Sequence, residues 1–188
     1  MASMPERLSA LEAALAAPDA RISAYHDLPF AIFHYAPEDE FALRQQVAGL
    51  RARLERQHGK EVVEISLARL MFEAIEQTVG GEALAEAERT SGLTATIETV
   101  GNILDQYVPL DATIAGLLAG MDRQRTVAFL VRAGALYPAF RTSSLLERLM
   151  GKVTVPTVLF YPGVLEGTVG LRFMGILEAD HNYRPKIY

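Results

Sequence analysis

Short apolar runs alternate along the chain with longer segments of helical periodicity. The clearest run, residues 126–131, places five apolar side chains in succession, and similar runs lie at residues 29–35 and 156–160. Each run is too short for a helix, and a strand that is apolar throughout is typical of a parallel sheet covered on both faces. With weaker runs at residues 62–65 and 171–174, they predict an α/β fold. We expect a mainly parallel sheet of about five strands, sandwiched by helices in a Rossmann-like or degenerate P-loop-like three-layer arrangement.

The segments between these runs carry apolar residues at helical spacing. Leucines form one stripe in residues 5–17. Pro37 suits the first turn of a second helix, which we expect to end at Gly59, because proline has no N–H to leave unbonded at a helix start. Residues 82–121 are helical but interrupted. We expect them to form a helical insertion before the central strand of one domain, residues 1–188.

The C-terminal third predicts a short helix and two more strands. Ser144 and Glu147 have the spacing of a capping box, which predicts a helix that runs to Gly151. The strand that follows is expected to end at residues 161–163. A glycine-spaced loop, residues 163–170, then leads to an edge strand and a polar tail.

The composition excludes several classes of protein. The chain of 188 residues has no cysteine, which rules out disulfides, thiolate metal sites and a cysteine nucleophile. Its net charge of -5 offers no positive field for duplex phosphates, so no direct DNA binding is expected. No signal-peptide pattern opens the chain, and no apolar run reaches the ~18 residues that span a bilayer. We expect a cytoplasmic protein without membrane contact.

Polar and aromatic side chains follow three of the expected strands. In parallel α/β sheets, functional crevices form outside the carboxyl ends of the strands. This rule places residues 34–39, 132–141 and 161–170 along one rim of the sheet. The candidate functional residues of this rim are Tyr35, Glu38, Asp39, Arg132, Tyr137, Arg141 and Tyr161.

The rim lacks the motifs of common enzymes. The stretch after the first strand has no glycine to admit a phosphate, and Glu38 and Asp39 there would repel one. No Gly-x-Ser-x-Gly elbow is present. His34 with Glu38 and Asp39 could form a metal site, but acids at a helix start are more often explained by the helix dipole. We therefore expect no catalytic, cofactor-binding or metal-binding residues.

Arg132 and Arg141 allow two interpretations. Arginines at strand ends can hold a carboxylate or phosphate ligand by two hydrogen bonds. They can also pair with Glu38 or Asp39 across the rim, which is the interpretation that we favour. The first alternative would make the chain a nucleotide- or phosphate-ligand-binding domain.

Three stretches resemble a known family. Residues 30–40 read FAIFHYAPEDE, residues 129–146 read FLVRAGALYPAFRTSSLL, and residues 158–163 read VLFYPG. They resemble the BrxB family of the bacteriophage exclusion (BREX) phage-defence systems. Residues 171–175 and 182–184 also look like the C-terminal pattern of that family. The positions that match are Tyr35, Pro37, Glu38, Asp39, Gly134, Tyr137, Pro138, Arg141, Ser144, Tyr161, Pro162 and Gly163.

The resemblance implies a role in an anti-phage complex. It implies a small cytoplasmic, non-catalytic adaptor without a cofactor, which acts by binding other proteins. The implied partners are a PglZ-like phosphatase-superfamily protein and other BREX components, which include an ATPase and a DNA methyltransferase. The sequence also leaves a homodimer open.

Overall fold

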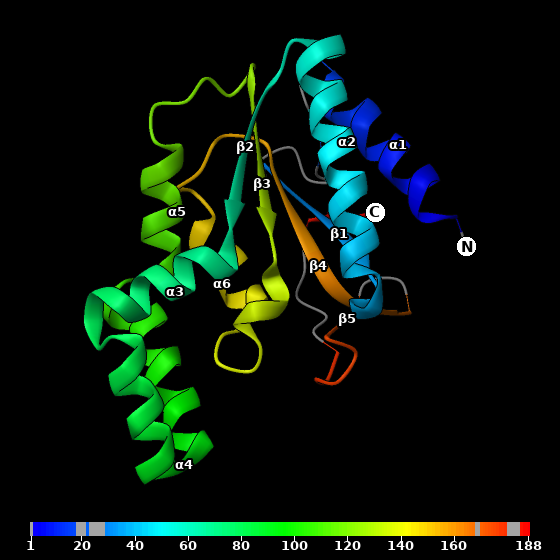
Figure 1. Ribbon diagram of the computed structural model, residues 1–188. Coiled ribbons are helices and arrows are strands. Elements are labelled where there is room, and N and C mark those ends of the chain that lie inside the picture. The colour runs from blue at the N-terminus through cyan, green and yellow to red at the C-terminus, as the bar shows by residue number, and fades with distance from the viewer. Residues whose placement is uncertain (1, 18–21, 23–28, 168–169, 180–184) are drawn as a thin grey trace.

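A mainly parallel sheet of six strands forms the centre of the protein (Figure 1). This computed structural model describes residues 2–17, 22, 29–167, 170–179 and 185–188. The strand order is β2-β3-β4-β1-β6, and β5 pairs with β4 off this path. The strands are β1 (Phe30–Tyr35), β2 (Glu61–Ser66), β3 (Thr126–Val131), β4 (Thr157–Glu166), β5 (Gly170–Phe173) and β6 (Lys186–Ile187). The β4–β5 pair is antiparallel and the other pairs are parallel, which confirms the predicted fold class.

Helices cover both faces of the sheet. They are α1 (Met4–Ala16), α2 (Glu40–His58), α3 (Leu67–Thr78), α4 (Gly81–Asn102), α5 (Leu110–Leu118) and α6 (Thr142–Leu149). The described residues also form the short helical turns η1 (Pro37–Asp39), η2 (Ile103–Tyr107) and η3 (Ala133–Leu136). In Figure 1, α1 and α2 lie on one side of the sheet, and α3, α5 and α6 lie on the other.

Two apolar cores form, one on each face, because successive strand residues point to opposite sides. Towards α1 and α2, the ring of Phe160 lies with its centroid 5.2 Å from that of Phe129 and 5.8 Å from that of Phe33. The neighbouring residues Leu130 and Leu159 point to the opposite core. All six residues of β3 are buried. The sheet therefore needs both helical layers.

The chain end forms a strand where a polar tail was expected. β6 pairs with β1, and the backbone N–H of Tyr188 donates to the carbonyl of Ile32. Arg7 of α1 donates from one guanidinium nitrogen to the carbonyls of His34 and Tyr188. Its guanidinium carbon also lies 4.8 Å from the ring centroid of Phe33. The sequence did not predict β6, because a strand this short is stabilised by its neighbours in the sheet and not by its own residues.

Two further boundaries differ from expectation. β4 does not end at residues 161–163 but continues to Glu166 and forms a hairpin with β5. The glycine-spaced segment was therefore wrongly expected to be a loop, although residues 168–169 lie outside the described part. α6 begins at Thr142, so Ser144 is not its cap. The reason is that Thr142 is buried and the N–H of Leu145 already bonds the carbonyl of Arg141.

The helical region before β3 is interrupted, as predicted. Gly92 breaks α4 with φ of 84° and ψ of 168°, and a π-helical turn, η2, follows α4. Figure 1 shows α4 extending away from the sheet. Val100 is its one buried residue, and α4 is described throughout. Over the described residues, the structure holds no helix with the length and apolar character of a membrane span.

Gly163 is a position where the β4–β5 hairpin tolerates no side chain. A Cβ there would lie 2.4 Å from the carbonyl oxygen of Arg172, whereas a Cβ at Gly116 of α5 would meet no atom within 4 Å. We expect Gly163→Ala to lower the free energy of unfolding by about 1–3 kcal/mol through overpacking. Gly116→Ala is the control and should raise it by roughly 0.5–1 kcal/mol, because alanine favours helix. Urea unfolding monitored by circular dichroism measures both, and equal effects would contradict the close approach.

Candidate functional site

The carboxyl ends of the parallel strands meet at one edge, but the sheet divides the expected rim residues between its two faces. Tyr35 packs in the core beneath α2, and Arg132 lines a cavity on that side. Tyr161 and Tyr137 belong to the opposite core. Arg141 lines cavities beside α6 on that opposite face. The rim is therefore two separate surfaces.

Glu38 and Asp39 contact neither arginine. Both acids are exposed in η1. Within the described residues, no ion pair joins Arg132 or Arg141 to a carboxylate. The favoured interpretation of a rim ion-pair network is therefore wrong for these residues. The physical reason is that η1 turns the two acids outward and the next residue, Glu40, turns inward.

Glu40 is the acid that reaches the edge, and it links two other side chains. The buried Tyr35 hydroxyl donates a short hydrogen bond to Glu40 Oε2. Arg44 Nε donates to Glu40 Oε1 at 2.9 Å. Burial, together with this hydrogen bond and the Glu40 charge, raises the pKa of Tyr35 above its ordinary value of 10.0. At neutral pH the Tyr35 hydroxyl therefore stays protonated and donates this hydrogen bond.

A cavity of about 240 Å³ opens beside this hydrogen-bonded chain. Its apolar wall comes from Leu43, Val47, Val131 and Phe160. Four charged side chains line it as well: Glu40, Arg44, Glu64 and Arg132. The balance of two carboxylates against two guanidinium groups leaves the cavity without net charge.

Arg132 adopts a backbone conformation that few residues of its type accept. It follows β3 directly, with φ of 60° and ψ of 38°. The left-handed region costs an L-residue with a Cβ about 1–2 kcal/mol, and glycine avoids this cost. Backbone strain of this kind clusters at functional sites, which makes Arg132 a candidate functional residue.

Three residues of this cavity were missed by sequence reasoning. Glu40 and Arg44 carried a usable signal, because residues four apart on a helix face each other. Glu64 carried a weaker one, since alternation along β2 places it on the same face as the buried Val62. The sequence did not predict the hydrogen bond from Tyr35 to Glu40, because the direction of the turn η1 decides which acidic side chain points inward.

An aromatic cluster lies at the same edge of the sheet, on the opposite face. The ring of Phe173 in β5 lies with its centroid 5.3 Å from that of Tyr161 and 6.2 Å from that of Tyr137. The buried Tyr161 hydroxyl donates to the carbonyl of Leu171 at 3.4 Å. These contacts pack the β4–β5 hairpin against the end of η3. Tyr137 and Tyr161 therefore pack together with Phe173 in this cluster.

A more open groove of about 520 Å³ separates α4 from α6. Arg141 and Ser144 line it, and Arg148 crosses it to pair with Asp105. Its base is tight, since a Cβ on Gly101 would lie 2.9 Å from the carbonyl oxygen of Ala139. Arg132 and Arg141 thus line different cavities, and one small ligand cannot be held by both.

His34 is partly buried near the end of β1. Burial lowers its pKa, and so does the charge of Arg7, whereas a hydrogen bond with the backbone of Gly163 opposes the shift. His34 is therefore neutral at pH 7. No group of three histidine or acidic side chains suited to a metal occurs in the part of the chain that the structure describes.

The comparisons with known proteins point to one family. Residues 63–187 match the family model described as BREX protein BrxB. This chain belongs to the BrxB family. A BREX protein BrxB of Bacillus cereus (strain H3081.97) is 23% identical over 160 residues, which cover 85% of this chain and 82% of the relative. No solved structure matches the chain.

Membership of the BrxB family connects the protein with BREX phage defence, as the resemblance implied. The matched segment runs from β2 to β6 and contains α4, Glu64, Arg132 and Arg141. Of the C-terminal stretches that carried the resemblance, residues 171–175 form the end of β5 and the turn after it. Residues 182–184 lie outside the described part.

The hydrogen bond from Tyr35 to Glu40 is expected to stabilise the fold. Tyr35→Phe should lower the free energy of unfolding by about 1–2 kcal/mol, because it removes a donor from a carboxylate. Tyr107→Phe is the control, since Tyr107 is 72% exposed and its change should be neutral.

Because of Tyr35, we also expect the free energy of unfolding to depend on pH in the alkaline range. Folding raises the pKa of Tyr35, so above pH 10.0 the folded state keeps a proton that the unfolded chain loses. Stability from this group is present below that pH and is lost as the pH rises beyond it. Tyr35→Phe should show a flatter alkaline decline in urea unfolding, and parallel declines would contradict the assignment.

Proposed function

We propose that this protein is a non-catalytic adaptor of a BREX complex and binds a PglZ-like partner through the helical region between β2 and β3. The observation that carries the proposal is the exposure of α4, a long helical element with one buried residue. Helices in proteins are usually stabilised by packing an apolar face against the rest of the fold. An element with so little packing of its own is typical of a surface that another protein covers.

Exposed apolar side chains gather in the same region. Of nine large apolar side chains exposed among the described residues, five lie within residues 67–118. Phe72 of α3 and Leu93 of α4 are each 62% exposed. Aromatic and aliphatic anchors of this kind supply most of the binding energy of protein interfaces.

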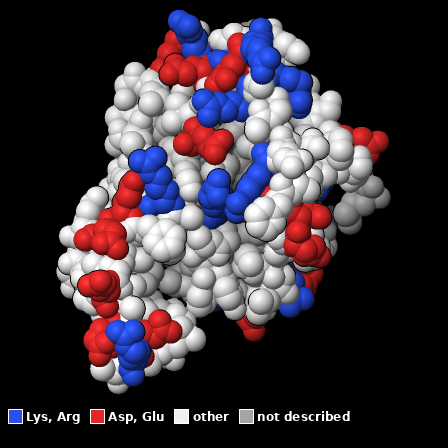
Figure 2. Space-filling view, in the orientation of Figure 1, with Lys and Arg blue, Asp and Glu red and all other residues white. Residues whose placement is uncertain are grey.

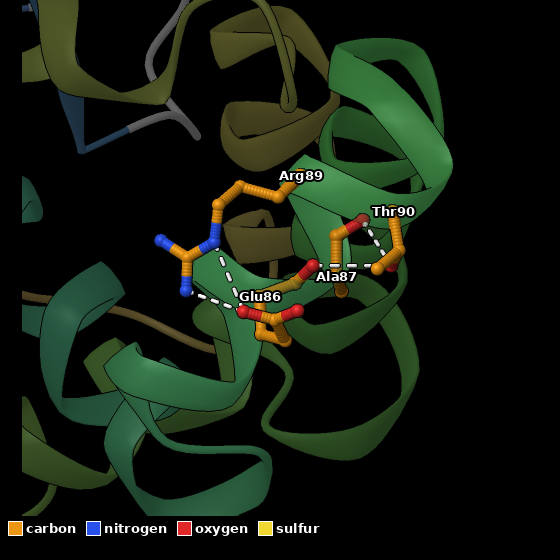
Figure 3. Close-up of polar contacts among 4 residues, drawn as sticks. All are labelled: Glu86, Ala87, Arg89 and Thr90. Atoms are coloured by element: carbon orange, nitrogen blue, oxygen red, sulfur yellow. Dashed lines mark hydrogen bonds and ion pairs between the residues drawn. The ribbon is translucent and has the colours of Figure 1, made fainter.

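The polar contacts of the first half of α4 are local. Arg89 Nε donates to Glu86 Oε2 at 2.9 Å, and the Thr90 hydroxyl donates to the carbonyls of Glu86 and Ala87. Figure 3 shows how these side chains lie along the helix. Each of these bonds joins residues three or four apart in the chain. They stabilise the helix but do not fasten it to the sheet.

The charge of α4 indicates the chemistry of its partner. Figure 2 shows mostly acidic side chains over the projecting end of the molecule at lower left. In α4 the acids are Glu82, Glu86, Glu88 and Glu98, and Arg89 is the one base. A partner with a basic surface around an apolar centre would fit it, because complementary charge speeds association and favours the right partner.

The alternative of a phosphate-binding domain has less support. It needed Arg132 and Arg141 with Glu38 and Asp39, and these residues do not converge on one cavity. The cavity beside Arg132 also holds two carboxylates, which disfavour a phosphate dianion.

Co-purification tests the adaptor proposal. We expect the double variant with Phe72→Ser and Leu93→Glu to retain the circular dichroism spectrum of the wild type. Tagged full-length double variant should recover about tenfold less of the PglZ-like protein than the tagged wild type does. Ile176→Ser removes an apolar side chain with 64% exposure outside the helical region and should leave recovery unchanged.

Two results would contradict this proposal. Wild-type protein that recovers no BREX component would exclude the adaptor role. Undiminished recovery by the folded double variant would exclude these helices as the docking surface. Sedimentation of the wild type and the double variant tests a homodimer, since a dimer lost only in the variant would assign the same helices to self-association.

A further inference from the structure

We propose that the cavity beside α2 binds a small amphoteric molecule, with its carboxylate at Arg132 and its amine at Glu64. This inference is independent of the adaptor role, because the residues that line the cavity lie at the carboxyl edge of the sheet and in α2, and none of them belongs to α4. Its support comes from the position of the cavity, from its charges and from its size.

The cavity lies where the chain leaves the sheet in opposite directions. β1 leads through η1 into α2 on one face, whereas β3 leads through η3 into α6 on the other. β4 lies between these two strands, and its Phe160 lines the cavity. Ligands of open α/β sheets bind at such a switch point, because the diverging connections leave a crevice there.

The charged groups of the cavity fall into two sets. Glu40 already accepts from Tyr35 and Arg44, so this set is satisfied without a ligand. Glu64 and Arg132 are exposed at the mouth of the cavity, and among the described residues neither side chain forms a hydrogen bond or an ion pair. They stand on neighbouring strands, β2 and the end of β3. One unpaired carboxylate and one unpaired guanidinium group on the same cavity match a ligand of two opposite charges.

The size and the wall of the cavity restrict the ligand further. Pockets for drug-sized molecules have about 300–1,000 Å³, so a cavity of about 240 Å³ suits a smaller molecule. Leu43, Val47 and Phe160 offer an apolar wall between the charged groups. An alkyl chain with a carboxylate at one end and an ammonium group at the other fits this arrangement.

The conformation of Arg132 provides a clean variant. Glycine adopts φ of 60° without the cost that a Cβ carries, so Arg132→Gly removes the guanidinium group and relieves backbone strain together. The variant should be at least as stable as the wild type. A loss of ligand binding would then come from the lost side chain and not from unfolding.

Isothermal titration calorimetry of the full chain tests the proposal with three probes. ε-Aminocaproate carries both charges, caproate lacks the amine, and hexylamine lacks the carboxylate. We expect the wild type to bind ε-aminocaproate about tenfold or more tightly than either single-charge probe. Arg132→Gly should abolish the advantage over hexylamine, and Glu64→Gln should abolish the advantage over caproate.

Two matched variants serve as controls. Glu61→Gln changes an exposed acid at the opposite end of β2, and Arg141→Ala changes an arginine at the same edge on the other face. Both should bind ε-aminocaproate as the wild type does. No binding to the wild type, equal binding of all three probes, or an equal loss in the control variants would overturn the proposal. None of these results bears on the recovery of BREX partners.

Discussion

The burial of β3 on both faces is the constraint on which the rest of the structure depends. All six of its residues are buried, and its neighbours β2 and β4 run parallel to it. Parallel strands need long connections, and those connections must carry helices to both faces to keep such a strand from water. The two layers, α1 with α2 on one face and α3, α5 and α6 on the other, follow from this need.

The same constraint decides where chemistry can occur. Because connections leave the carboxyl edge towards opposite faces, side chains that are close in the sheet point to different cavities. Tyr35 and Arg132 face α2, whereas Tyr161 and Tyr137 face α6 and β5. One side holds a tyrosine, two carboxylates and two arginines around a cavity, and the other is an aromatic packing cluster.

The two proposals place different tasks in different parts of the molecule. BrxB membership connects the chain with BREX defence, and a component of such a system works with other proteins. The cavity at the carboxyl edge of the sheet is small and partly enclosed, which fits a small ligand. In contrast, α4 is long, acidic and little buried, which fits a protein partner. The proposed protein partner and the proposed small ligand therefore occupy separate surfaces of the molecule.

The sequence by itself determined the α/β class, the strands β1 to β3 and the break in the helical region, because these depend on local periodicity and on residues such as Gly92. It also placed Tyr35 and Arg132 at the carboxyl edge. Only the tertiary structure decided that Glu40 and not Glu38 turns inward, that Arg141 lies away from Arg132, and that the last residues form β6. These outcomes depend on contacts between segments far apart in the chain or on the direction of one turn, and neither leaves a periodic signal in the sequence.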